Sequence, residues 1–213
     1  MSTNRTEAFS DGVFAIAATL LVLELKIPHA EAGELLGALL ERWPSYATYA
    51  VSFLTIGIIW VNHHAILDRV KRVDRPLLFI NLVFLMVVAA IPFPTALLAD
   101  YLREGHDERL AAAIYGGTMW MMGLAICAVW VYVVRGGLLH QEVDRDLAQR
   151  SLRIFALGIP AYPLGIAASV LSAKLGLAVY ALIALFYMFD VLPSLQEGAD
   201  EEQVDHKPRM PAG

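Results

Sequence analysis

The stretch NRTEAFSDGVFAIAATLLVLELKIP, residues 4–28, decides the fold of this chain. Its second half is an apolar run suited to a membrane, yet its first turns carry Arg5, Glu7, Ser10 and Asp11. Ionisable groups in membrane-spanning segments are costly and usually face protein or water rather than lipid. We therefore expect a membrane helix whose polar beginning is packed against other helices.

The composition of the whole chain also indicates an integral membrane protein. Of its 213 residues, 58% are hydrophobic and 17% are charged, whereas soluble domains are about half apolar and a quarter charged. The net charge of −5 owes much to the segment EGADEEQVD, residues 197–205, so a nucleic-acid partner is not expected. The single cysteine, Cys127, lies in an apolar run and is expected to be a buried, inert thiol.

Spanning the hydrocarbon core takes about 20 apolar residues, and six stretches reach or approach that length. Residues Ser172 to Lys174 interrupt the last apolar block and predict a tight hairpin there. The prediction is an all-α membrane protein with six transmembrane helices per subunit. These helices form one transmembrane domain over residues 1–195, followed by a disordered acidic tail over residues 196–213. The expected spans are 9–27, 45–67, 77–99, 110–134, 153–172 and 175–193.

The distribution of basic residues predicts the orientation in the membrane. Most of the 16 lysines and arginines fall on the side of the N-terminus, including the basic link DRVKRVDR at residues 68–75. Cytoplasmic loops carry an excess of Lys and Arg. Both chain termini are therefore predicted to be cytoplasmic.

The first helix has two distinct faces. At 100° per residue, four branched aliphatic residues fall on one stripe with Thr19 at its edge: Ile16, Leu20, Leu23 and Ile27. Asp11 lies about 140° away from this stripe, above Ala15, Ala18 and Val22. Small residues let helix backbones approach closely. We expect the face below Asp11 to contact neighbouring helices, whereas the aliphatic stripe faces something else.

Polar residues in the next two segments are candidate partners for Asp11. In IIWVNHHAILD, Trp60 and His64 share a helix face, and Asn81 is a lone amide in the following apolar segment. Asn4 and Glu7 resemble a capping box and predict a helix beginning near Arg5. We expect one polar network that locks three helices together; its members are Arg5, Ser10, Asp11, Trp60, His64 and Asn81.

Two other functions are compatible with these residues. His63, His64 and Asp11 can titrate, so a proton-conducting or proton-coupled membrane transporter is the alternative. A metal site is not expected, because adjacent histidines on a helix point 100° apart and no H-x-x-x-H pair is present there. Neither Ser10 nor Asp11 has a histidine at a spacing that establishes a nucleophile–base pair. We therefore expect no enzyme, no catalytic residue and no cofactor.

The motif that begins the first helix resembles a known family signature. Arg5, Phe9, Ser10 and Asp11 match the RxxxFSD signature of the transmembrane-protein-175 potassium channel family. The resemblance extends to WVNHH at residues 60–64, to Asn81 and to IPFPT at residues 91–95.

This resemblance implies a potassium-preferring cation channel in which the first helix lines the pore. A single repeat, as in bacterial members, implies a homotetramer in a bacterial plasma membrane, with potassium ions and the lipid bilayer as its other partners. It also implies that Ile16 is the first constriction, that Leu20 and Leu23 form further rings, and that Thr19 is a pore-proximal hydroxyl. Arg5, Phe9, Ser10 and Asp11 are then structural supports rather than ion ligands.

The sequence contains no T-V-G-Y-G filter of backbone carbonyls. Selectivity is therefore expected to come from a narrow hydrophobic neck that closes by dewetting. Potassium holds its hydration shell less tightly than sodium, so it crosses such a neck at a smaller penalty. A modest preference for potassium is expected.

Overall fold

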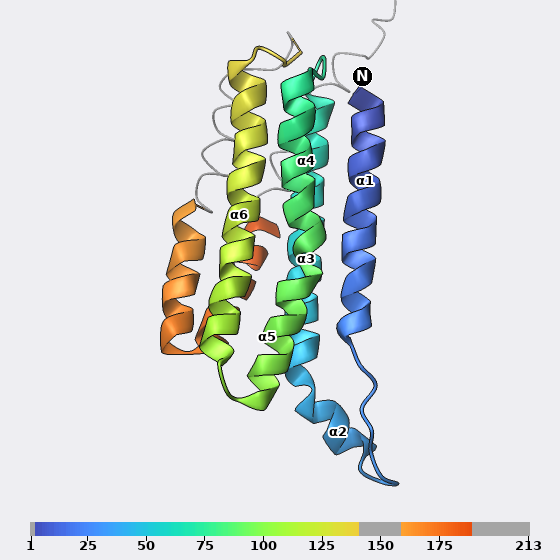
Figure 1. Cartoon of the computed structure of the whole chain (residues 1–213), viewed down its shortest axis with the longest axis vertical. Helices are drawn as coiled ribbons and strands as arrows, with labels where there is room; N and C mark the ends of the chain where they lie inside the picture. The colour runs from blue at the N-terminus through green and yellow to red at the C-terminus, as the bar shows by residue number, and fades with distance from the viewer. Residues whose placement is uncertain (1–2, 141–158, 189–213) are drawn as a thin grey trace, which may run out of the picture.

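Apolar helices account for nearly all of the chain that the computed structural model describes, residues 3–140 and 159–188 (Figure 1). In this part of the chain, four helical stretches are long and apolar enough to cross a membrane: Thr3–Glu24, Trp43–Asp68, Arg75–Glu104 and Glu108–Arg135. Two shorter apolar helices follow, Ile159–Leu171 and Ala173–Met188. Such a chain fits the integral membrane protein that its composition indicates. The expected tail, residues 196–213, lies outside the described residues, as do residues 153–158 and 189–193 of the fifth and sixth expected spans.

The long helices run side by side along the longest dimension of the molecule (Figure 1). The N-terminus lies at the same end as the start of α4 and the end of α6, and α1 packs against α3 and α4. The helix Ile159–Leu171 lies beside α6 on the side away from α1, whereas Ala173–Met188 lies behind α6 in the view of Figure 1. The element bounds are α1 Thr3–Leu20, η1 Leu21–Glu24, α2 Leu35–Glu41, α3 Trp43–Asp68, α4 Arg75–Ala90, α5 Pro92–Glu104 and α6 Glu108–Arg135.

The third expected span continues further than the sequence indicates. Prediction ended it at residue 99, but α5 follows α4 after one interruption at Ile91 and runs to Glu104. Pro92 and Pro94 lack backbone N–H groups, which interrupts the hydrogen-bond ladder of a helix. Ile91 itself is fully buried, and its carbonyl accepts from Thr95 N at 3.2 Å, so the chain turns into a second helix rather than stopping.

The hairpin predicted at residues 172–174 is present. Ser172 separates the two C-terminal helices: its N–H donates to Ala168 O at the end of the first helix, and its carbonyl accepts from Gly176 N at the start of the second, both at 3.0 Å. Tyr180 anchors the second helix to α6 by donating to Ala112 O at 3.1 Å. The ring of Tyr180 packs directly against Gly116, where a methyl group would collide with it.

A second set of contacts closes the end of the bundle at which the N-terminus lies. Asp74 caps α4 by accepting from Leu77 N at 2.9 Å, and its other oxygen accepts from the Tyr132 hydroxyl at 2.9 Å. The α3–α4 connection also pairs with the chain after α6, because Lys71 N donates to Leu138 O at 2.8 Å. Burial lowers the pKa of the Arg69 guanidinium, an effect that neighbouring Asp68 opposes. These contacts fix where α3 ends and α4 begins.

Candidate functional site

The face of α1 that packs within the subunit differs from the expected one. Its buried residues are Thr6, Ser10, Phe14, Ala17 and Leu21. The prediction that Ala15, Ala18 and Val22 form the packing face is confirmed within the subunit for Ala18 alone, which is half-buried against the core. It is wrong for the other two, because Ala15 is exposed and Val22 is 50% exposed. The physical reason is the large Phe14 ring, which fills a slot between α3 and α4 and sets the rotation of the helix.

A buried polar chain joins α1, α4 and α3. Asn81 donates its amide N–H to Ser10 Oγ at 3.0 Å, and Ser10 donates to its own helix at Thr6 O at 2.8 Å. Asn81 Oδ1 lies 2.8 Å from His63 Nε2. Because the Asn81 nitrogen is used on Ser10, its oxygen must accept, so His63 carries its proton on Nε2. Each of the three helices thus contributes one side chain to this chain of bonds.

Aromatic rings enclose His63. Its centroid lies 5.2 Å from that of Phe84 in a stacked arrangement and 5.5 Å from that of Phe14 in a tilted one. His63 is fully buried, and its Nδ1 atom has no hydrogen-bond partner among the residues that the structure describes. A second proton on Nδ1 would be a buried, unpaired donor, which is costly. This environment favours a neutral, structural histidine.

A second row of polar contacts runs along the outer side of the α1–α3 interface. Trp60 Nε1 donates to Asp11 Oδ1 at 2.8 Å. One turn further toward the N-terminus, Glu7 Oε1 lies 2.7 Å from His64 Nδ1, and His64 Nε2 lies 3.4 Å from Asp68. The two interhelix pairs are Asp11–Trp60 and Glu7–His64. Moving four residues back along α1 corresponds to moving four residues forward along α3, as expected for antiparallel helices. The Trp60 and His64 rings also stack, with centroids 6.1 Å apart.

The six residues that were expected in one network therefore belong to two separate sets of contacts, and one of them, Arg5, belongs to neither. Ser10 and Asn81 meet in the buried chain, whereas Asp11 and Trp60 meet in the outer row. His64 joins the outer row through Glu7. Arg5 is exposed and makes no hydrogen bond or ion pair with any residue in the described part of the chain, and Phe9 is 55% exposed.

The aliphatic stripe of α1 and η1 is exposed in the described parts of the subunit. Ile16 is 61% exposed, Leu20 42% and Leu23 68%. Thr19 lies exposed among them, and its hydroxyl donates to the carbonyls of Ala15 at 2.9 Å and Ile16 at 3.0 Å. Because the hydroxyl proton is used in hydrogen bonds to the helix itself, only the lone pairs of the Thr19 oxygen are available to a group outside the helix.

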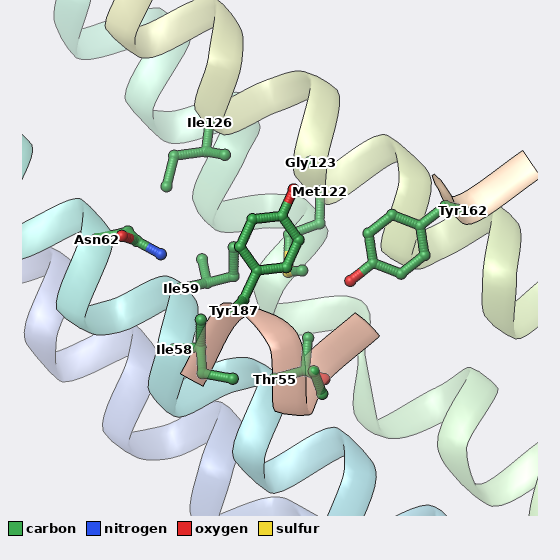
Figure 2. A pocket seen from close by; sticks show the side chains of 10 residues that line it. Thr55, Ile58, Ile59, Asn62, Met122, Gly123, Ile126, Tyr162 and Tyr187 are labelled. Carbon is green, nitrogen blue, oxygen red and sulfur yellow. The ribbon is translucent and has the colours of Figure 1, made fainter. Parts of the chain in front are cut away.

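A cavity lies between α3, α6 and the two C-terminal helices (Figure 2). Its volume is about 30 Å³, which leaves room for only one or two water molecules. Asn62 points toward it from α3, and Tyr187 occupies its centre (Figure 2). Its lining has no charged side chain, so we assign no ion path to it; the lining residues are Thr55, Ile58, Ile59, Asn62, Met122, Gly123, Ile126, Tyr162, Ala184 and Tyr187.

Sequence reasoning missed the structural part played by His63 and the pairing of Glu7. His63 belongs to the buried face of α3 that also includes Ile56, Ile66 and Leu67. That periodicity was a usable signal, because residues seven and ten positions apart lie on neighbouring sides of a helix. No comparable signal marked Glu7, whose partner lies on another helix.

Over residues 3–140 and 159–188, the chain is a helical bundle with four apolar helices of spanning length and with its internal polar groups largely paired, as in an integral membrane protein. Residues 5–92 match the family model described as endosomal/lysosomal potassium channel TMEM175. The chain belongs to the TMEM175 potassium channel family.

Relatives match nearly the whole chain. A potassium channel of Streptomyces collinus is 52% identical over 90% of this chain and 94% of its own length. The crystal structure of a lysosomal potassium-selective channel TMEM175 homologue from Chamaesiphon minutus superposes with a TM-score of 0.79 at 37% identity, covering 90% of this chain and 97% of that one. The endosomal/lysosomal proton channel TMEM175 of Gallus gallus is 33% identical over 67% of this chain, which spans only 29% of that relative.

Proposed function

We propose that this protein is a potassium-preferring cation channel of a bacterial plasma membrane, built as a homotetramer with α1 of each subunit around a central pore. The observation that carries the proposal is the exposed stripe of Ile16, Leu20 and Leu23 on a helix that α3 and α4 hold from its other side. A near full-length relative named as a potassium channel supports the same function.

Each subunit then contributes six transmembrane helices within residues 1–195, followed by an acidic cytoplasmic tail over residues 196–213. The α4–α5 stretch supplies the third helix, and the two C-terminal helices belong to the fifth and sixth. The basic α3–α4 connection lies at the same end as the N-terminus, which supports cytoplasmic placement of both termini under the positive-inside rule.

Ion passage is controlled in this proposal by a hydrophobic neck. Four copies of Ile16, with Leu20 and Leu23 beyond, narrow the pore and exclude water when closed, as hydrophobic gates do. Slight widening admits ions with incomplete hydration, which favours potassium over sodium. The Thr19 oxygen, with free lone pairs, offers a polar ring between these aliphatic layers.

The test is potassium flux in liposomes that contain the purified protein. Ile16→Asn places a polar ring in the neck and should raise the resting flux. Leu182→Asn is the matched control, because Leu182 is an equally exposed leucine, at 64%, on the last helix. Equal increases in both variants would mean that bilayer disruption, not a gate, causes the flux.

The stoichiometry and the central helix need a separate measurement. Native mass spectrometry should give four chains per particle. Leu23→Cys should form disulfide-linked dimers on oxidation, because equivalent residues then surround one axis. A monomer in native spectra, or cross-linking no faster than for Leu182→Cys, would contradict the tetramer with α1 at its centre.

Proton conduction is the second candidate, because a relative is named as a proton channel. Liposomes loaded with a pH-sensitive dye distinguish the two functions. If the protein conducts potassium, an outward potassium gradient creates a membrane potential that can drive protons inward. Protons then enter only after a proton ionophore is added, because the protein itself gives them no pathway. Proton influx without added ionophore would establish the second function.

A further inference from the structure

Three potential metal ligands converge at the outer α1–α3 interface, apart from the exposed aliphatic stripe. Glu7 comes from α1, and His64 and Asp68 come from the last turns of α3. One ligand atom from each lies within 4.8 Å of the other two. Their side chains are 22%, 47% and 59% exposed, so an aqueous ion can reach them.

The helix register holds these ligands together. His64 and Asp68 are four residues apart on α3 and therefore lie one turn apart on the same face. Glu7 is brought level with them because Asp11, one turn along α1, is hydrogen-bonded to Trp60, one turn back along α3. The Trp60 ring stacks on His64 and restricts its orientation. The arrangement is thus organised by contacts other than those among the three ligands.

We propose that Glu7, His64 and Asp68 bind a divalent transition-metal ion of the zinc type, which links α1 to α3. Zn²⁺ takes imidazole nitrogen and carboxylate oxygen at about 2.0–2.2 Å, usually four ligands in a tetrahedral arrangement. The ligand atoms of such a tetrahedron lie about 3.3–3.6 Å from one another. Glu7 and Asp68 face different ring nitrogens of His64, so side-chain rotation that brings both carboxylates to one nitrogen completes the site. Water supplies the fourth ligand. The imidazole nitrogen disfavours Mg²⁺ and Ca²⁺, which take oxygen ligands.

The same contacts also suit a His64 side chain hydrogen-bonded between two carboxylates without any metal. A metal site has a fixed stoichiometry and loses binding when one ligand is removed, whereas a hydrogen-bonded group of this kind binds no metal. No part of this distinction depends on potassium conduction, so its outcome is separate from that of the channel proposal.

The experiment is calorimetric titration of the full-length protein with Zn²⁺ in detergent micelles, after removal of any polyhistidine tag. We expect one Zn²⁺ per chain. His64→Gln should abolish this binding, and Glu7→Gln or Asp68→Asn should weaken it at least about tenfold, since even outer-shell partners are worth 10–100-fold in affinity. When the unchanged chain is titrated with Co²⁺, we expect the visible absorption bands that are typical of four-coordinate Co²⁺.

His106→Gln is the matched control, because His106 pairs with a single carboxylate, Glu104, at 3.5 Å and has no third ligand in the described residues. It should bind Zn²⁺ like the unchanged chain. The thermal unfolding midpoint should rise with Zn²⁺ in the unchanged chain and in His106→Gln, but not in His64→Gln. Absence of Zn²⁺ binding to the unchanged chain, or unchanged affinity in His64→Gln, would overturn the proposal.

Discussion

Trp60 of α3 donates its indole N–H to Asp11 of α1 across 2.8 Å. Together with the Phe14 ring, which packs against His63 and Phe84, this bond fixes the rotation of α1, because the position of one side chain on a helix determines where the others point. Ile16 lies five residues further along and therefore about 140° away from Asp11. The bond consequently directs the aliphatic stripe away from α3. Asp11 of the RxxxFSD motif is not proposed to contact an ion, but it positions Ile16 and the rest of the stripe, which are proposed to line the pore.

Loss of the Trp60–Asp11 bond should destabilise the subunit. Trp60→Phe keeps most of the ring but removes the donor. A hydrogen bond to a charged group contributes about 1.5–3 kcal/mol, and partial exposure of Trp60 should reduce this to about 1 kcal/mol. Thermal unfolding of Trp60→Phe, Asp11→Asn and the double variant in detergent measures the coupling. Trp43→Phe is the control, and additive effects of the first two changes would contradict the coupling.

Thr19 should contribute to ion preference through its oxygen. Thr19→Val preserves the branched shape but removes the lone pairs that its internal hydrogen bonds leave available. We expect the ratio of potassium to sodium flux to fall while potassium flux persists. Thr118→Val is the matched control, because Thr118 is also bonded to its own helix, at Ile114 O, 3.0 Å. Equal changes in the two ratios would remove Thr19 from the selectivity mechanism.

The buried chain through Asn81 should show unequal sensitivity to its members. Asn81→Ala removes two bonds and leaves the His63 donor unpaired, whereas Ser10→Ala leaves only the Asn81 amide without its acceptor. Unpaired buried groups cost about 1–3 kcal/mol each. Asn81→Ala should therefore lower the free energy of unfolding about twice as much as Ser10→Ala, as measured by chemical denaturation in mixed micelles.

A double replacement provides the control for that ordering. His63→Phe with Asn81→Leu removes both polar partners, and replacing both by apolar groups of similar shape can be nearly neutral. The Phe84 and Phe14 rings already form an aromatic environment for the new side chain. The double variant should be more stable than Asn81→Ala. A larger loss in the double variant would mean that packing, not hydrogen bonding, determines the effect.

The sequence predicted the helical class and the hairpin at Ser172 because both depend on local properties, apolar length and an interrupted run. It could not assign His63 and His64 to separate contacts. Adjacent residues differ by 100°, and both faces of α3 meet protein near α1. The choice depends on the rotation of α3, which the Trp60–Asp11 bond and the Phe14 slot decide together. Those are contacts between residues far apart in the sequence.

The α4–α5 connection shows the same limitation for proline. Pro92 and Pro94 indicate that the helical ladder is interrupted, but the sequence prediction extended the third span past both prolines and ended it at residue 99. Proline either ends or kinks a helix. The full burial of Ile91 and its bond to Thr95 select continuation. Tertiary packing, absent from any local pattern, therefore determines whether α5 exists.

Two adjacent glycines of α6 should respond oppositely to the same substitution. A Cβ at Gly116 would lie 2.5 Å from Tyr180 Cζ and 2.8 Å from Ile166 Cγ1, whereas nothing lies within 4 Å of a Cβ at Gly117. Gly116→Ala must displace the C-terminal helix pair, and overpacking of this kind costs about 1–3 kcal/mol. Gly117→Ala should be neutral or stabilise by up to about 1 kcal/mol, since alanine is the better helix former. Thermal unfolding of both variants in one detergent measures the difference. Similar midpoints would show that Tyr180 does not fix the C-terminal helices against α6.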